Sequence, residues 1–125
     1  MPEPQKVSIL IVEDHAATAR AVDKYLSSIG YDVQVATDAA AARDLAAKHS
    51  FDVLLCDINL PDGNGWDLMR DLNRGRAIPG IAISGFASDN DIRRSERAGF
   101  VRHLAKPFSP DDLTTALEAV CAASS

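Results

Sequence analysis

Apolar residues come in short runs that predict buried β-strands. Residues 7–12, 51–57 and 80–84 lack the strict alternation of apolar and polar side chains. Such runs are typical of a parallel sheet that is covered by helices on both faces. Residues 33–36 do alternate, which favours an edge strand with one wetter face. A further short run at residues 101–106 predicts the last strand.

Between these runs, apolar residues recur at every third or fourth position and predict helices. In residues 16–29 this spacing is clear, and Gly30 supplies a left-handed stop. Helices are also expected at residues 39–49, 66–75, 89–99 and from 109 onward. Five strands alternating with five helices predict an α/β fold, a flavodoxin-like (βα)5 sandwich. Counted along the chain, its parallel strands are expected in the order 2-1-3-4-5.

The expected helix at residues 89–99 has clear end signals but few apolar residues. Ser88 or Asp89 is suited to cap its start and Gly99 its end, whereas only Ile92 and Ala98 between them are apolar. Helices in proteins gain most of their stability from a packed apolar face. We therefore expect this helix to shift or fray more readily than the others.

Length and composition favour a single domain over residues 1–125, with a core at about 7–122. The chain is 46% hydrophobic and carries a formal net charge of -5 without any basic run, which argues against direct nucleic-acid binding. Cys56 and Cys121 lie among apolar neighbours, and no signal segment begins the sequence. A cytoplasmic location without a disulfide is therefore expected, and no apolar run is long enough for membrane insertion.

Polar residues stand directly at the ends of four predicted strands. These residues are Glu13, Asp14, Asp57, Ser84 and Lys106. The carboxyl ends of parallel strands meet at one edge of the sheet, where ligands bind in such folds. We therefore expect these residues to lie together although they are far apart in sequence.

This set of side chains suits a phosphoryl group. Three carboxylates in one place repel one another unless a cation lies among them, and oxygen ligands favour a hard cation such as Mg2+, with Mn2+ as an alternative. Lys106 adds a fixed positive charge and Ser84 a hydroxyl, while Asp57 is the candidate nucleophile. Each residue alone is better explained as a helix cap or a solvated charge, because polar groups at the ends of elements are often structural. Their combination at one edge favours a functional site.

Four short motifs contain these residues. They are Glu13-Asp14 after the first strand, Asp57 in CDINLPDGNG, Ser84 in AISG and Lys106-Pro107 in LAKPF. In order and spacing they resemble the receiver domains of two-component response regulators, over essentially the whole chain.

The resemblance implies a role for each residue of the expected site. Asp57 would be the phosphoacceptor in a phosphorelay, and Ser84 and Lys106 would hold the phosphate oxygens. Asp14, Asp57 and the backbone carbonyl of Asn59 would bind Mg2+, while Glu13 would act on the metal through water. The resemblance also implies a cis peptide bond between Lys106 and Pro107.

The resemblance implies protein partners as well. The phosphoryl donor would be a histidine kinase or a histidine phosphotransfer domain, and a downstream protein partner would read a surface around the fourth helix and last strand. The domain would catalyse its own phosphorylation and slow dephosphorylation, so it is a signalling switch and whether it is an enzyme is a matter of definition. Residues 84–113 are similar to receivers that are attached to, or work with, hybrid histidine kinases.

One position departs from the usual receiver pattern. Receivers usually carry an aromatic residue three positions before the lysine, and here that residue is His103. It is interpreted as a surface or packing residue, as an imidazole that swings like the aromatic ring, or as a sign that backbone movement alone carries the signal.

Several neighbours of the motifs are interpreted more simply. The Asn59 amide is suited to orient an attacking water and the apolar Phe86 to shield the site, so the two have opposite effects on phosphate lifetime. Trp66 is expected in the core or at a helix end, and Cys56 as a buried structural thiol. His15 and His49 are expected at the surface.

Three other functions fit parts of the pattern. A docking domain that works without phosphorylation would keep the fold, but the complete set of acids, hydroxyl and lysine argues against it. An aspartate-nucleophile phosphatase would need an acid two residues after Asp57, where Asn59 stands. A flavin-binding flavodoxin would need a phosphate-binding loop after the first strand, where Glu13 and Asp14 stand.

Overall fold

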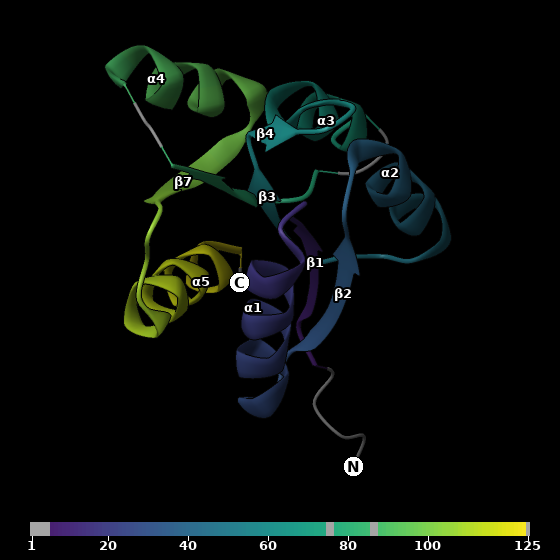
Figure 1. Cartoon of the computed structure of the whole chain (residues 1–125), viewed down its shortest axis with the longest axis vertical. Coiled ribbons are helices and arrows are strands. Elements are labelled where there is room, and N and C mark those ends of the chain that lie inside the picture. Colours follow the sequence, from purple (N-terminus) through teal and green to yellow (C-terminus); the bar gives the residue numbers. More distant parts are fainter. Residues whose placement is uncertain (1–5, 75–76, 86–87, 125) are drawn as a thin grey trace.

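A five-stranded parallel sheet forms the centre of the computed structural model, which describes residues 6–74, 77–85 and 88–124 (Figure 1). Its strands lie in the order β2-β1-β3-β6-β7, which are the second, first, third, fourth and fifth of the predicted strands. The predicted order is therefore confirmed. The strands are β1 (Ser8–Val12), β2 (Asp32–Ala36), β3 (Val53–Asp57), β6 (Gly80–Ser84) and β7 (Phe100–Ala105).

The predicted helices are all present within the described residues. They are α1 (Ala16–Ser28), α2 (Ala39–Lys48), α3 (Gly65–Leu72), α4 (Asp89–Ala98) and α5 (Pro110–Ser124). α3 ends before the predicted limit, because the side chain of Asn73 accepts a hydrogen bond from the backbone N–H of Ile78 at 2.7 Å and turns the chain there. Gly75, the predicted stop, lies outside the described residues.

Helices cover both faces of the sheet, with α1 and α5 on one face and α2, α3 and α4 on the other (Figure 1). On the first face, Ile9 and Leu55 pack with Leu26 of α1 and Leu117 of α5. On the other, the alternate strand residues pack with side chains of α2, α3 and α4. Because successive strand residues point to opposite faces and both faces are buried, the strands lack polar alternation.

The loop after β3 contains a small hairpin that the sequence did not indicate. β4 (Asn59–Leu60) pairs antiparallel with β5 (Gly63–Asn64), and two residues per strand are too few for a periodic pattern. In its turn, Asp62 accepts hydrogen bonds from the backbone N–H groups of Ala39 and Ala40 at 2.8 and 3.0 Å, which lowers the pKa of its carboxyl group. The hairpin is thereby tied to the start of α2.

Both cysteines are free thiols, Cys56 buried and Cys121 half-buried. Burial raises the pKa of each thiol, so neither is readily ionised. The interpretation of Cys56 as a buried thiol is confirmed. Among the described residues, no helix has the length and apolar character that a bilayer crossing requires.

Candidate functional site

The strand ends bring the predicted site residues to one edge of the sheet. Asp57 and Ser84 are the last residues of β3 and β6, and Glu13 directly follows β1. Lys106 directly follows β7, and its backbone N–H donates to the carbonyl oxygen of Ser84 at 2.8 Å. The parallel pairing of the strands therefore places these polar side chains together.

Lys106 bridges two buried carboxylates. Its Nζ donates hydrogen bonds of 2.8 Å to Oδ2 of Asp57 and of 2.8 Å to Oε1 of Glu13. Glu13 is only 2% exposed and Asp57 only 4%. Burial alone lowers the pKa of Lys106, but its hydrogen bonds to Asp57 and Glu13 outweigh that effect, and the net pKa is raised. Lys106 therefore stays protonated and supplies a fixed positive charge to the site.

The environment of Glu13 disfavours the ionised form of its carboxyl group. Burial raises the pKa of its carboxyl group, the neighbouring Asp57 raises it further, and Lys106 offsets only part of this. Its second oxygen, Oε2, is buried and has no hydrogen-bond partner among the described residues. The ionised form of Glu13 is therefore under-compensated within the chain.

The backbone around Asp57 is held closely by the following loop. The backbone N–H of Asn59 donates to Oδ1 of Asp57 at 2.9 Å, and the N–H of Gly65 donates to the carbonyl oxygen of Ile58 at 2.8 Å. A Cβ atom on Gly65 would lie 2.7 Å from the carbonyl oxygen of Asp57, which leaves no room for a side chain. Gly65 was not identified as a site residue, although the glycines after the acceptor in CDINLPDGNG were a signal.

The acidic residues fit a hard cation. Ligand atoms of Glu13, Asp14, His15 and Asp57 all lie within 4.8 Å of one another. Three of these residues offer carboxylate oxygens, and the unpartnered Oε2 of Glu13 would gain a partner from a cation or its bound water. Hard oxygen donors are the ligands that Mg2+ and Mn2+ prefer.

His15 is a member of this cluster that sequence reasoning placed only at the surface. Its Nδ1 lies 3.2 Å from Oε1 of Glu13 and 3.4 Å from Oδ1 of Asp14, although its side chain is 71% exposed. Its position directly after the acidic pair was the available signal. A protonated His15 would partly neutralise the two acids.

The hydroxyl group of Ser84 is linked to the residue at the unusual position. Oγ of Ser84 lies 2.9 Å from Nε2 of His103, within hydrogen-bond distance. His103 is half-buried, and burial lowers the pKa of its imidazole while Asp91 partly offsets this. Its Nδ1 is buried and has no hydrogen-bond partner among the described residues. His103 is therefore a half-buried residue within hydrogen-bond distance of a predicted site residue.

Trp66 and Ser84 line the same cavity. A cavity of about 240 Å³ is lined by Ile58, Asn59, Trp66, Ser84, Asp91 and His103. Trp66 is half-buried against the core, as expected, but its indole N–H also donates to Oγ of the buried Ser95 of α4 at 2.9 Å. Trp66 therefore connects the core, the cavity and α4. Phe86, which was expected to shield the site, lies outside the described residues.

The peptide bond between Lys106 and Pro107 is cis, as the family resemblance implied. Comparison with known proteins extends this likeness to most of the chain. A family model described as the response regulator receiver domain matches residues 9–118. The chain is 32% identical over 115 residues to the sensor protein EvgS of Escherichia coli K12, covering 91% of this chain and 10% of that protein. It is 29% identical over 113 residues to the cell cycle response regulator CtrA of Brucella ovis, covering 90% of this chain and 49% of that protein.

Solved structures give the same result. A CheY-like response regulator receiver domain protein from Methanospirillum hungatei JF-1 superposes with a TM-score of 0.87 at 29% identity, over 92% of this chain and 93% of the other. The chemotaxis protein CheY4 of Vibrio cholerae superposes with a TM-score of 0.89 at 26% identity, over 93% and 99% of the two chains. The chain thus spans half or less of these two longer sequence relatives but almost all of these structural neighbours.

Proposed function

The chain belongs to the response regulator receiver domain family, and on this premise we propose that Asp57 accepts a phosphoryl group from a phosphohistidine donor. The observation that carries the proposal is the contact between Asp57 and Lys106. A carboxylate at a strand end, 4% exposed and 2.8 Å from a lysine ammonium group, is oriented and charge-compensated for reaction with an anionic substrate.

The proposed reaction is a transfer between two nucleophiles. A carboxylate oxygen of Asp57 attacks the phosphorus atom, and an O–P bond forms while the P–N bond to the donor imidazole breaks. The electron pair of that bond leaves with the imidazole nitrogen. Phosphoryl transfer depends mainly on positioning and on charge stabilisation. Lys106 would exchange its hydrogen bond to Oδ2 of Asp57 for one to a phosphoryl oxygen. Its positive charge would then lie next to the negative charge of the transferred phosphoryl group.

A divalent cation completes the proposed site. Glu13, Asp14, Asp57 and the backbone carbonyl of Asn59 would hold Mg2+ or Mn2+, with Glu13 acting through water. When bound, the ion neutralises the negative charge of the phosphoryl oxygens. The unpartnered Oε2 of Glu13 supports this assignment.

Ser84 and His103 form the proposed readout of phosphorylation. To hold a phosphoryl oxygen on Asp57, the hydroxyl group of Ser84 would rotate away from Nε2 of His103, which is now 2.9 Å away. The imidazole would lose that hydrogen bond and would be released to move. Phosphorylation can shift the equilibrium between the two conformations only by the difference in free energy between their contacts, those of Ser84 with His103 and those of Ser84 with the phosphoryl oxygen.

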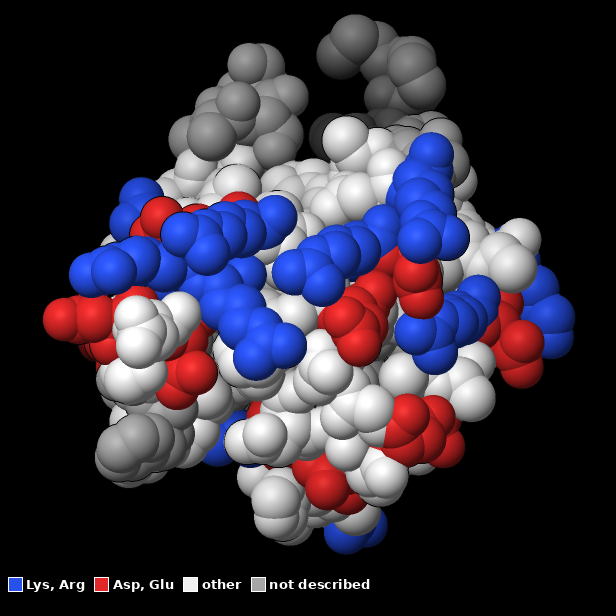
Figure 2. Space-filling model, turned by 90° about the horizontal axis from the view of Figure 1, so that it is seen from above, with Lys and Arg blue, Asp and Glu red and all other residues white. Residues whose placement is uncertain are grey.

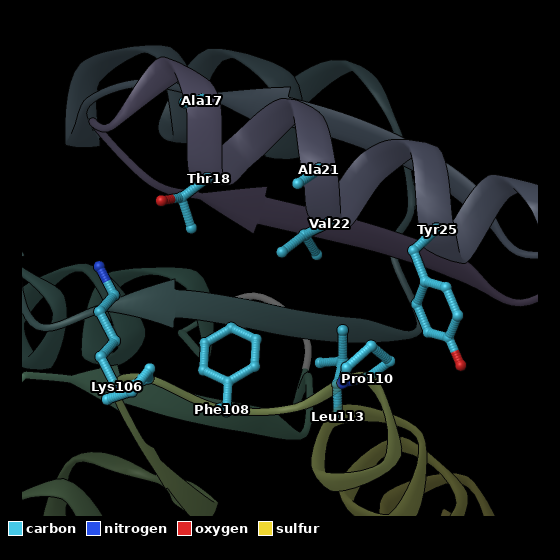
Figure 3. A pocket seen from close by; sticks show the side chains of 10 residues that line it. Ala17, Thr18, Ala21, Val22, Tyr25, Lys106, Phe108, Pro110 and Leu113 are labelled. Carbon is cyan, nitrogen blue, oxygen red and sulfur yellow. The ribbon is translucent and has the colours of Figure 1, made fainter.

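The donor would dock beside Lys106. An open groove of about 690 Å³ lies between α1 and the segment that leads into α5. Figure 3 shows Thr18 and Lys106 at one end of it. Val22, Phe108 and Leu113 give the groove an apolar lining. Because the phosphohistidine must reach Asp57, which contacts Lys106, we place the histidine kinase or phosphotransfer domain over this groove. We also place this exchange in the cytoplasm, where the free thiols would stay reduced.

The proposal is tested by labelling with acetyl phosphate in the presence of Mg2+. The wild-type protein should incorporate one phosphoryl group, and Asp57→Asn should abolish incorporation, because an amide nitrogen is not a nucleophile under these conditions. Asp44→Asn is the matched control, since it makes the same chemical change at an exposed carboxylate of α2 and should leave labelling unchanged. Equal labelling of wild type and Asp57→Asn would overturn the assignment. An unlabelled wild type would favour a docking domain that works without phosphorylation.

A further inference from the structure

The imidazole of His103 borders a cavity that adjoins the proposed phosphoryl site. The cavity has a volume of about 240 Å³, and its lining includes the polar residues Asn59, Ser84, Asp91 and His103. Two of these residues also border the phosphoryl site. The backbone N–H of Asn59 donates to Oδ1 of Asp57 at 2.9 Å, and Ser84 is proposed to hold a phosphoryl oxygen. The cavity therefore lies next to the place that the phosphoryl group would occupy.

This cavity is suited to hold the water that hydrolysis of an aspartyl phosphate requires. Liquid water occupies about 30 Å³ per molecule, so about 240 Å³ has room for several molecules. An ordered water needs about two to four polar partners. The side-chain amide of Asn59, the hydroxyl group of Ser84 and the imidazole of His103 are partners of this kind.

The imidazole of His103 is able to accept a proton from such a water. In a neutral imidazole, one ring nitrogen carries the proton and the other offers a lone pair. With the proton on Nδ1, the lone pair of Nε2 faces Oγ of Ser84, which lies 2.9 Å away. When Ser84 turns to a phosphoryl oxygen, Nε2 becomes available to the water. Burial lowers the pKa of the ring, so its neutral form predominates at pH 7.

We propose that His103 is the general base for hydrolysis of the phosphoryl group on Asp57, an inference that rests on the proposed function. The oxygen atom of a water in the cavity attacks phosphorus while Nε2 of His103 takes one proton from that water. The P–O bond to Asp57 breaks, and its electron pair returns to the carboxylate. The products are inorganic phosphate and the free carboxylate of Asp57. The negative charge of Asp91 on α4 favours the imidazolium ion that forms.

The rotation of Ser84 that reports phosphorylation would then also limit its lifetime. Before phosphorylation, the hydroxyl group of Ser84 lies against Nε2 of His103. After phosphorylation, the same nitrogen faces the cavity and its water. A phenylalanine ring at this position has no lone pair and cannot take a proton. The histidine that replaces the usual aromatic residue therefore shortens the phosphorylated state.

The charges around His103 determine how its proton affinity responds to pH. Besides Asp91, the charged residues that share a cavity with His103 are Arg102 of β7 and Asp112 of α5, which have opposite charges. Figure 2, which looks down on α4 and α3, shows basic and acidic side chains next to one another on this face. Surface charges of both signs partly offset each other. We therefore expect protonation of His103 itself to dominate the pH dependence of hydrolysis.

The inference is tested by the rate at which the labelled protein loses its phosphoryl group. Protein labelled with radioactive acetyl phosphate and Mg2+ is separated from the donor by rapid desalting, and the remaining label is followed over time. His103→Gln and His103→Phe should each lose label at least about tenfold more slowly than wild type, because neither side chain accepts a proton. His49→Gln, at an exposed histidine, is the matched control and should lose label at the wild-type rate.

Chemical rescue separates a base from a residue that only packs. His103→Ala leaves space beside the cavity, and added imidazole should restore hydrolysis in proportion to the concentration of its neutral form. In wild type, the rate should fall as the pH is lowered through the range in which the ring gains a proton, and His103→Gln should lack this fall. Slow hydrolysis in the variants without rescue and without a changed pH profile would overturn the inference.

Equal rates of loss in wild type, His103→Gln and His103→Phe would overturn it as well. That result would leave the proposed function intact, because all three proteins would carry the label. A wild-type protein that takes up no label would overturn the proposed function and this inference together. The uptake and the loss of label therefore distinguish the two.

Discussion

At the residue scale, Lys106 holds two buried carboxylates at once, but burial and the neighbouring Asp57 outweigh its effect and leave Glu13 with a raised pKa. A carboxyl group with a raised pKa binds more protons in the folded than in the unfolded state. Its contribution to stability is therefore lost as the pH rises above the ordinary value of 4.5. In the absence of a divalent cation, we therefore expect ionisation of Glu13 to lower the stability of the fold as the pH rises toward neutrality.

We therefore expect Glu13→Gln to raise the free energy of unfolding by about 1 kcal/mol at neutral pH without Mg2+, because it removes an under-compensated buried charge. Mg2+ should stabilise wild type and should stabilise the variant less. Urea unfolding with and without Mg2+ measures both effects, and Glu96→Gln, at an exposed position of α4, is the control. A less stable Glu13→Gln protein without metal would contradict this description of the site.

His103 should contribute to stability with the opposite dependence on pH. Burial lowers the pKa of its imidazole, so the unfolded state binds more protons near the ordinary value of 6.5, and the stability that depends on neutral His103 is lost as the pH falls through this region. Urea unfolding at about pH 7 and about pH 5.5 should show a smaller loss for His103→Gln than for wild type. His49→Gln, at an exposed position, should behave like wild type. Equal losses in all three proteins would contradict a half-buried neutral imidazole.

The sequence predicted those residues of the site that lie at the ends of strands. Asp57, Ser84 and Lys106 end or follow buried strands, and a parallel sheet must bring them to one edge. The hydrogen bond between Ser84 and His103 was not predictable, because side-chain contact across strands depends on register. The tight contact of Gly65 with the Asp57 backbone depends likewise on the path of the loop.

At the element scale, α4 has few apolar anchors, as its sequence indicates. Its fully buried side chains are Ser95 and Ala98. The contribution of Trp66 was not predictable, because its partners lie in a different helix: its N–H donates to Ser95, and Arg94 lies 4.1 Å from the centre of its ring. These contacts partly replace the missing apolar face of α4.

α4 should therefore show the fastest amide exchange among the helices, and Trp66→Phe should make it faster still. Loss of the indole N–H leaves Oγ of Ser95 without this donor and should cost about 1 kcal/mol of local stability, or roughly fivefold in exchange rate. Hydrogen exchange read by mass spectrometry measures this, with α2 as the internal reference. The double variant Trp66→Phe, Ser95→Ala removes both partners and should recover part of the loss. Uniform protection across all helices would contradict the account of α4.

At the scale of the whole molecule, the fold was predictable because the five strands of the main sheet and the five helices are each marked in the sequence by an apolar run, by apolar spacing or by capping residues. The distribution of charge was not. A net charge of -5 with no basic run gave no sign of how acidic and basic side chains are distributed over the surface, because that distribution depends on how the helices pack on the sheet. Composition therefore gives only the average charge, whereas a partner contacts a local part of the surface.

The central claim is that Asp57 is the residue that carries the phosphoryl group, and chemical trapping tests it most directly. After incubation with acetyl phosphate and Mg2+, borohydride reduces an aspartyl phosphate to homoserine, and peptide mapping then identifies the modified position. We expect homoserine at position 57 alone, dependent on both the donor and the metal. Homoserine at position 14, or an unmodified chain under conditions where the fold is intact, would contradict the account.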